Sequence, residues 1–142
     1  PKENYSHIKY STEDYIAVCA TSHQFNKKPH TIHDLISEHL LVREEGSGTR
    51  NILEQSLIAH GLHISNFTHY TQVENMHTIM NLLKKDCGIS FLYKIAVEKE
   101  LKSKELKEIT LDDFKLQHDF DIIWQKESIY ADKYLSISTE FI

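Results

Sequence analysis

Apolar residues recur along the chain in two patterns that alternate from one end to the other. Short runs of apolar, aromatic or β-branched residues predict a buried strand at 15–20, further strands at 40–44, 66–72, 89–92 and 119–125, and a short strand or a loop at 109–111. Apolar residues at helical spacing predict helices at 31–36, 49–60, 73–83, 94–101 and 130–141. This alternation is typical of an α/β fold, in which helices cover the faces of a sheet.

The most informative segment joins the strand at 40–44 to the helix that follows it. Two glycines flank a serine there, in Glu45-Gly46-Ser47-Gly48-Thr49. The first backbone N–H groups of a helix have no partner within it and lie at the positive end of its dipole. Because glycine lets a ligand approach the backbone closely, the segment predicts an anion site. Alternatively, Ser47 or Thr49 only caps the helix, and the two roles can coexist.

Composition and charge exclude several classes of protein. The chain has 142 residues, 40% of them apolar and 26% charged, as expected for one globular domain. A net charge of −5 without a basic stripe makes this chain by itself a poor nucleic-acid binder. No run approaches the ~18 apolar residues of a membrane span, and the N-terminus lacks the apolar core of a signal peptide. Cys19 and Cys87 are expected to be small buried residues rather than a disulfide, which favours a cytoplasmic location.

Only two arginines occur, and both flank the glycine segment. Arg43 and Arg50 each carry a planar fork that suits a carboxylate or a phosphate. The alternative is that both lie at the surface in ion pairs with neighbouring glutamates. The possible partners are Glu44, Glu45 and Glu54.

Metal and catalytic patterns are missing from the sequence. His30 and His33, like His60 and His63, are three residues apart, but zinc needs three or four convergent ligands and no cysteine pair or HExxH motif supports either pair. We therefore expect exposed histidines and no metal. The P-loop lysine, the G-x-S-x-G elbow and a nucleophile–base signature are also absent, so the sequence predicts neither an enzyme nor a cofactor.

Several segments, in chain order, resemble LysR-type transcriptional regulators. They are residues 14–18, 41–50, 73–75, 88–92 and 94–101, and the resemblance extends from about residue 10 to residue 142. Two positions depart from the family's pattern. Asp86 stands where members often have glycine, and Tyr93 stands where many have proline. Aspartate tolerates the left-handed conformation, so the helix before it can still end there.

The resemblance implies a domain plan. Members carry an N-terminal winged helix-turn-helix domain, a linker helix and an effector-binding domain of two α/β lobes. Residues 1–127 would form the second lobe, a single lobe of a periplasmic-binding-protein-like (type 2) fold with a five-stranded mixed sheet flanked by helices. Residues 128–142 would form a helix that returns to a first lobe missing from this chain. We expect this helix to pack against another copy or against the same lobe.

The resemblance also implies a site. In such regulators a small-molecule effector lies between the lobes and controls DNA binding by the N-terminal domain. The residues that match the second lobe's contribution are Gly46, Ser47, Gly48, Thr49, Thr71, Gln72, Val73 and Glu74. Hydroxyls and free N–H groups beyond the carboxyl ends of strands suit a small polar or anionic metabolite. The partners implied are that effector, DNA only through the missing domain, no membrane, and further copies of the chain in a homo-oligomer.

Two other functions remain open on the sequence alone. One is a solute-binding lobe of a periplasmic-type binding protein, which a signal peptide on the full-length gene would favour. The other is an enzyme on a related fold, which turnover abolished by Ser47→Ala or Thr49→Ala would favour.

Overall fold

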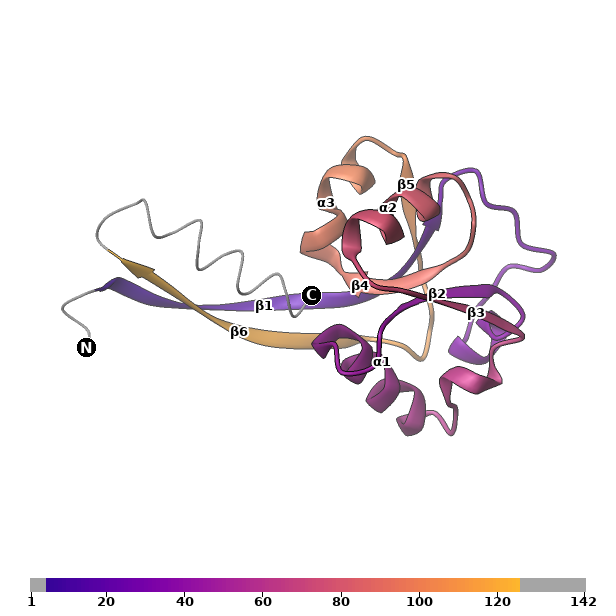
Figure 1. Ribbon diagram of the computed structural model, residues 1–142, viewed down its shortest axis with the longest axis horizontal. Helices are drawn as coiled ribbons and strands as arrows, with labels where there is room; N and C mark the ends of the chain where they lie inside the picture. Colours follow the sequence, from indigo (N-terminus) through magenta and orange to yellow (C-terminus); the bar gives the residue numbers. More distant parts are fainter. Residues whose placement is uncertain (1–4, 126–142) are drawn as a thin grey trace.

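The computed structural model describes residues 5–125, and within them the side chains of residues 12–117 (Figure 1). The helix expected at 130–141, and the division at residue 128, lie outside the described residues. The elements alternate as the sequence predicts. In order they are β1 (Tyr5–Ala20), the 3₁₀ helix η2 (Ile32–Leu35), β2 (His39–Arg43), α1 (Gly48–Ala59), the 3₁₀ helix η3 (Ile64–Asn66), β3 (His69–Val73), α2 (Met76–Lys84), β4 (Ser90–Tyr93), α3 (Lys94–Lys102), β5 (Leu106–Ile109) and β6 (Leu116–Gln125).

The central sheet is mixed, as predicted. β1 pairs antiparallel with β4 on one side and with β5 on the other, and β2 pairs parallel with β3. A parallel bridge between Leu40 and Ile89 joins β2 to β4, with the Leu41 N–H donating to the Ile89 carbonyl at 2.8 Å. The strand order is therefore β3-β2-β4-β1-β5. β5 lies near the segment for which a short strand or a loop was expected, and β6, which covers the strand expected at 119–125, also belongs to the sheet through its pairing with β1.

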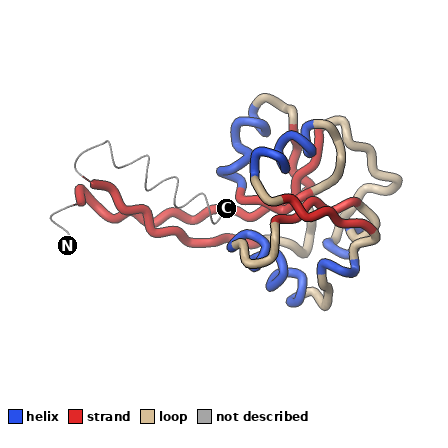
Figure 2. Tube along the Cα trace, in the orientation of Figure 1, coloured by secondary structure: helices blue, strands red, loops and turns tan. Residues whose placement is uncertain are grey.

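β1 is much longer than its predicted apolar run. Its first two-thirds pair antiparallel with β6, from Tyr5 opposite Gln125 to Tyr15 opposite Leu116. The two strands leave the lobe as a two-stranded ribbon (Figures 1 and 2). Residues 5–14 lack a continuous apolar run, so their strand conformation depends on β6, about a hundred residues away in the sequence.

Two apolar cores lie on opposite faces of the sheet. Alternate residues of β1 enter different cores, because successive side chains of a strand point to opposite faces. Tyr15, Ala17 and Cys19 pack in the core with α1, whereas Ile16 and Val18 pack in the core with α2 and α3. Cys19 is buried as expected, but the expectation for Cys87 was wrong, since this free thiol is exposed in the turn after α2.

The turn between α2 and β4 depends on two residues, Asp86 and Gly88. Asp86 follows α2 with φ +58°, the left-handed conformation expected for it. Gly88 is needed for close packing rather than for its dihedral angle, since a Cβ atom there would lie 2.6 Å from the His39 carbonyl oxygen. Glycine at this position therefore lets the chain entering β4 approach β2.

Candidate functional site

The glycine segment forms a sharp corner between β2 and α1. Gly46 has φ +91°, and the Ser47 N–H donates to the Glu44 carbonyl at 3.2 Å, which closes the turn. Ser47 then caps the helix, because its Oγ accepts from the Arg50 N–H at 3.1 Å. The capping role considered for this residue is confirmed.

The cap leaves other first-turn donors unused. Ser47 satisfies the N–H of Arg50, but no hydrogen bond among the described residues uses the N–H of Gly48 or Thr49. Ser47 and Gly48 are partly exposed. The start of α1 therefore offers backbone donors at the positive end of a 12-residue helix.

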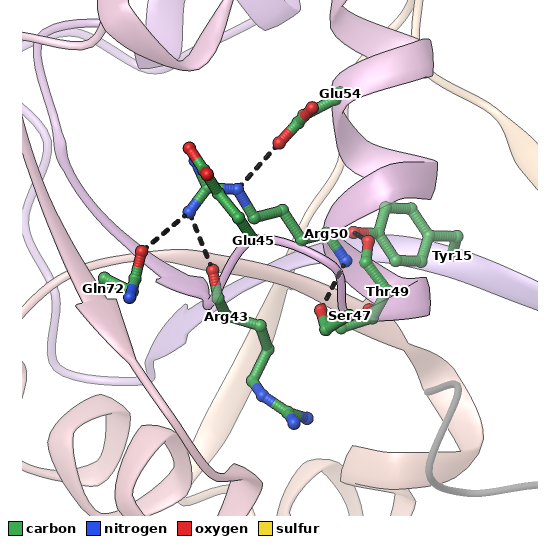
Figure 3. A network of polar contacts seen from close by, with 8 residues as sticks. All are labelled: Tyr15, Arg43, Glu45, Ser47, Thr49, Arg50, Glu54 and Gln72. Atoms are coloured by element: carbon green, nitrogen blue, oxygen red, sulfur yellow. Dashed lines mark hydrogen bonds and ion pairs between the residues drawn. The ribbon is translucent and has the colours of Figure 1, made fainter.

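Arg50 ties three elements together behind this corner (Figure 3). Its Nε donates to Glu54 at 2.7 Å, and its Nη1 donates to the Arg43 carbonyl at 3.0 Å and to Gln72 at 3.2 Å. Nη2 lies 3.7 Å from a carboxylate oxygen of Glu45. The expected ion pairs with Glu54 and Glu45 are confirmed, but the residue is buried and not at the surface.

Thr49 lies behind the first turn of α1. It is 2% exposed, and its carbonyl accepts a hydrogen bond from the Tyr15 hydroxyl at 3.2 Å. Its own Oγ1 is buried without a hydrogen-bond partner. Burial raises the pKa of Tyr15 and raises that of Tyr93 to about 12, so both tyrosines are neutral at physiological pH. Their rings pack edge to face beside β4.

Arg43, the last residue of β2, forms an incomplete ion pair with Glu44. Its Nη2 donates to Glu44 Oε1 at 2.9 Å, and this bond holds the pKa of Glu44 below its usual value. Arg43 Nε and Glu44 Oε2 are both buried without hydrogen-bond partners. Together with Thr49 Oγ1, three unpaired polar atoms therefore lie within seven residues. Buried polar atoms are nearly always paired, so this cluster marks the corner as unusual.

A small hollow lies between the corner and the sheet. Its lining includes Arg43, Thr49, Arg50, Tyr15 and Ser90, and its void is about 10 Å³. That is roughly the room for one water molecule. A metabolite can reach these groups only if a side chain at the corner moves.

The other predicted site residues follow at the end of β3. Gln72 joins the corner through Arg50, and Val73 is buried while Glu74 is exposed. The Thr71 hydroxyl lies 2.6 Å from His39 Nε2, and as the neighbour of Gln72 in a strand it faces the other way. The structure thus links Gln72 to the guanidinium of Arg50 and leaves Thr71 on the opposite face of β3.

Tyr15, Arg43 and Arg50 lie at the corner but were not among the predicted site residues. Tyr15 could not be found from the sequence, because it comes from a strand 34 positions away from Thr49. The two arginines carried a usable signal, since they are the only ones in the chain and flank the glycine segment.

Several histidines differ from expectation. His23 is 16% exposed and lies 2.6 Å from Asp86 and 2.7 Å from Glu38, and His60 bonds two backbone carbonyls. The expectation that the histidines are exposed was therefore wrong for these two. In the described part of the chain, no three His, Cys, Asp or Glu side chains are grouped so that they could hold a metal ion. Over the same range, no helix is long and apolar enough to cross a bilayer.

A second hollow, of about 250 Å³, lies on the outer side of α1. It is lined by Arg50 and by Glu45, Glu54, Ile58, His63–Ser65 and Tyr70. Two carboxylates face one guanidinium there, so this hollow suits an anion less well than the corner does.

Comparison with known proteins identifies relatives. The family model for the LysR substrate binding domain matches residues 2–130. The transcriptional regulator CbbR of Rhodospirillum rubrum is 28% identical over 124 residues, which is 87% of this chain and 40% of CbbR. This chain thus spans less than half the length of that relative.

Solved structures agree on the fold. The regulatory domain of Synechocystis CcmR, in complex with 2-PG, has a TM-score of 0.64 at 20% identity and covers 98% of this chain and 70% of that one. The effector-binding domain of QuiR, in complex with shikimate, has a TM-score of 0.61 at 16% identity and covers 98% of this chain and 67% of that one. The predicted fold, an α/β lobe of the type 2 periplasmic-binding-protein kind, is confirmed.

Proposed function

The chain belongs to the family of LysR substrate-binding domains, and from this premise we propose that it senses a small polar or anionic metabolite at the start of α1. The observation that carries the proposal is the corner itself. Unused N–H groups of Gly48 and Thr49 lie beside the buried, unpaired hydroxyl of Thr49. Both lie where β2 and β4 end, the usual position of ligands in open α/β sheets.

The proposed contacts are those predicted from the sequence, except that Thr71 has a smaller role. Gly46, Ser47, Gly48 and Thr49 surround the ligand's charged or polar group, and Gln72, Val73 and Glu74 border it from the end of β3. Thr71 contributes least, because its hydroxyl is engaged with His39. The complexes of CcmR with 2-PG and of QuiR with shikimate support an acidic ligand.

We further propose that ligand binding controls a DNA-binding domain elsewhere in the complete protein. CbbR is named as a helix-turn-helix transcriptional regulator, and its greater length leaves room for such a domain. A ligand shifts an arrangement of domains only if it binds one arrangement better than another. In this proposal the protein is a cytoplasmic homo-oligomer that binds its effector without turning it over.

A titration followed by NMR tests the proposed site. The ¹⁵N-labelled chain is titrated with shikimate, and with methyl shikimate as the neutral probe. We expect amide shifts centred on Gly46, Gly48 and Thr49 with the acid and smaller ones with the ester. Thr49→Val, which keeps the side-chain shape and removes the hydroxyl, should weaken binding about tenfold, which is about 1.4 kcal/mol. Its stability should be unchanged or slightly higher, because an unpaired buried hydroxyl is lost.

Thr68→Val is the matched control. Thr68 precedes β3 at the opposite end of that strand from Val73, and it is exposed. Equal weakening by Thr49→Val and Thr68→Val, or shifts confined to residues outside the corner, would contradict the proposed site.

A further inference from the structure

The two arginines at the corner differ in how completely they are bonded. Arg50 donates through Nε and Nη1 to three acceptors on α1, β2 and β3. Arg43 makes one side-chain hydrogen bond, from Nη2 to Glu44, and its Nε is buried and unpaired. The two guanidinium groups point in different directions (Figure 3). Arg50 therefore has a structural role, because its guanidinium links three elements. Arg43, in contrast, has a buried Nε donor that makes no hydrogen bond.

The Arg43–Glu44 pair is incomplete on both sides. An arginine and a carboxylate usually match through two parallel hydrogen bonds. Here Glu44 supplies one oxygen, and its other oxygen is buried without a partner, like Arg43 Nε. Adjacent residues of one chain cannot readily align both groups, so Glu44 satisfies Arg43 poorly. A separate carboxylate or phosphate could approach Arg43 without that constraint.

Glu44 can leave Arg43 without disturbing the corner. Its backbone is held, because its carbonyl accepts the Ser47 N–H at 3.2 Å. Its side chain is 31% exposed, so solvent lies next to it, whereas the side chain of Arg43 is 15% exposed. The void beside Arg43 and Thr49, about 10 Å³, is too small for a metabolite in the present arrangement.

We propose that Glu44 occupies the place of the ligand's acid group on Arg43 when no ligand is bound. On binding, the carboxylate or phosphate of the ligand accepts hydrogen bonds from Nε and Nη2 of Arg43, and Glu44 turns toward solvent. Thr49 Oγ1, which lines the same hollow, donates to the ligand. This inference rests on the proposed function and adds an anchor, Arg43, and an internal competitor, Glu44.

The experiment compares Glu44→Gln with Glu45→Gln. Both variants remove one negative charge at the corner, but Glu45 is 85% exposed and its ion pair is with Arg50, at 3.7 Å. Affinities for shikimate and for inorganic phosphate are measured by NMR titration of the labelled chain, so that the two probes separate a carboxylate from a phosphate preference. Glu44→Gln should raise the affinity for one or both probes about tenfold, since the competing charge is gone. Glu45→Gln should change it less than about twofold.

A double variant tests whether the gain passes through Arg43. Arg43→Gln combined with Glu44→Gln should lose the whole gain, and the amide spectrum reports that each variant is folded. Equal gains in affinity in Glu44→Gln and Glu45→Gln would overturn the inference, because loss of general charge repulsion between the corner and the anion would then explain both. The proposed function would remain intact. Unchanged affinity in Glu44→Gln would also overturn the inference alone. No shift at the corner with either probe in any variant would overturn the proposed function, and the inference with it.

Discussion

The starts of α1 and α2 are alike in capping and differ in what lies behind the cap. Each helix follows a strand, β2 or β3, after a short turn. Ser47 accepts the N–H of Arg50 at 3.1 Å, and Asn75 accepts the N–H of Thr78 at 2.8 Å. Judged by capping alone, the two starts are equivalent.

The two helix starts differ in how deeply the residues of their first turns are buried. The first turn of α1 contains Thr49 and Arg50, which are 2% and 9% exposed, whereas His77 and Thr78 in the first turn of α2 are exposed. Thr49 has a buried hydroxyl without a partner, and no side chain of α2, all of which the structure describes, has such an atom. In each helix the side-chain cap satisfies one backbone N–H of the first turn. Of the two helices, α1 is the one with a buried, unpaired hydroxyl in its first turn that a ligand could satisfy.

The largest predicted effect concerns the arginine behind the α1 cap. Arg50→Met removes the donors to Glu54, Gln72 and the Arg43 carbonyl, and should lower the free energy of unfolding by about 2 kcal/mol, because hydrogen bonds made by a buried charged group are lost. Urea denaturation followed by circular dichroism measures it. Lys84→Met on α2 is the control, because its pair with Glu105 is 3.7 Å long and partly exposed, and should cost less than about 1 kcal/mol. Similar losses in both variants would remove the distinction between the two regions.

Removing the caps gives a smaller effect that compares the helices directly. Ser47→Ala and Asn75→Ala should each cost about 1 kcal/mol of stability, because each leaves one N–H of the first turn without its side-chain acceptor. The same denaturation measurement applies. In the shikimate titration, only Ser47→Ala should weaken binding. If Asn75→Ala weakens it equally, the start of α2 belongs to the site as well.

The smallest predicted effect is at the other end of α1. His60 follows the helix, and its ring nitrogens lie 2.9 Å from the Ser56 carbonyl and 2.7 Å from the Asp113 carbonyl. Both partners only accept hydrogen bonds, so the two contacts favour the protonated ring, in which both nitrogens donate. The Ser56 carbonyl, and then that of Asp113, raise the pKa of His60 above 6.5.

The raised pKa of His60 predicts how the free energy of unfolding changes with pH. Because the folded-state pKa is raised, the stabilisation is fully present below pH 6.5 and is lost as pH rises through the folded value. We expect a loss on the order of 0.5 kcal/mol, as for a cation near a helix C-terminus. Unfolding measured from pH 5.5 to 8.5 should show this slope in the parent chain and not in His60→Gln. α2 ends at Lys84 and Lys85 with no histidine, and an equal slope in His60→Gln would assign the effect elsewhere.

Much of the fold follows from short-range patterns. The strands and helices between Tyr15 and Leu101 lie close to where the apolar spacing predicts them. The Ser47 cap and the left-handed Asp86 follow from the chemistry of those residues and their immediate neighbours. The first ten residues of β1 could not be predicted, because they form a strand by pairing with β6 at the far end of the sequence.

The candidate site divides in the same way. Gly46, Ser47, Gly48 and Thr49 are recognisable in the sequence as a helix start with room for a ligand. The different roles of Arg43 and Arg50 are not recognisable in the sequence, since both are arginines with glutamates within five residues. The exposure of Cys87 and the partial burial of His23 were missed for the same reason, because neither follows from the residue type.

The sequence alone determined the order of elements, the corner after β2 and the capped start of α1, because backbone preferences and capping act over one or two turns of chain. The tertiary structure decided which polar atoms at that corner are paired and which are left over. Pairing there depends on Tyr15 and Gln72, which come from two other strands, and on how tightly the sheet encloses Thr49 and Arg43. Burial and hydrogen bonding are properties of the assembled lobe, so no local pattern could specify them.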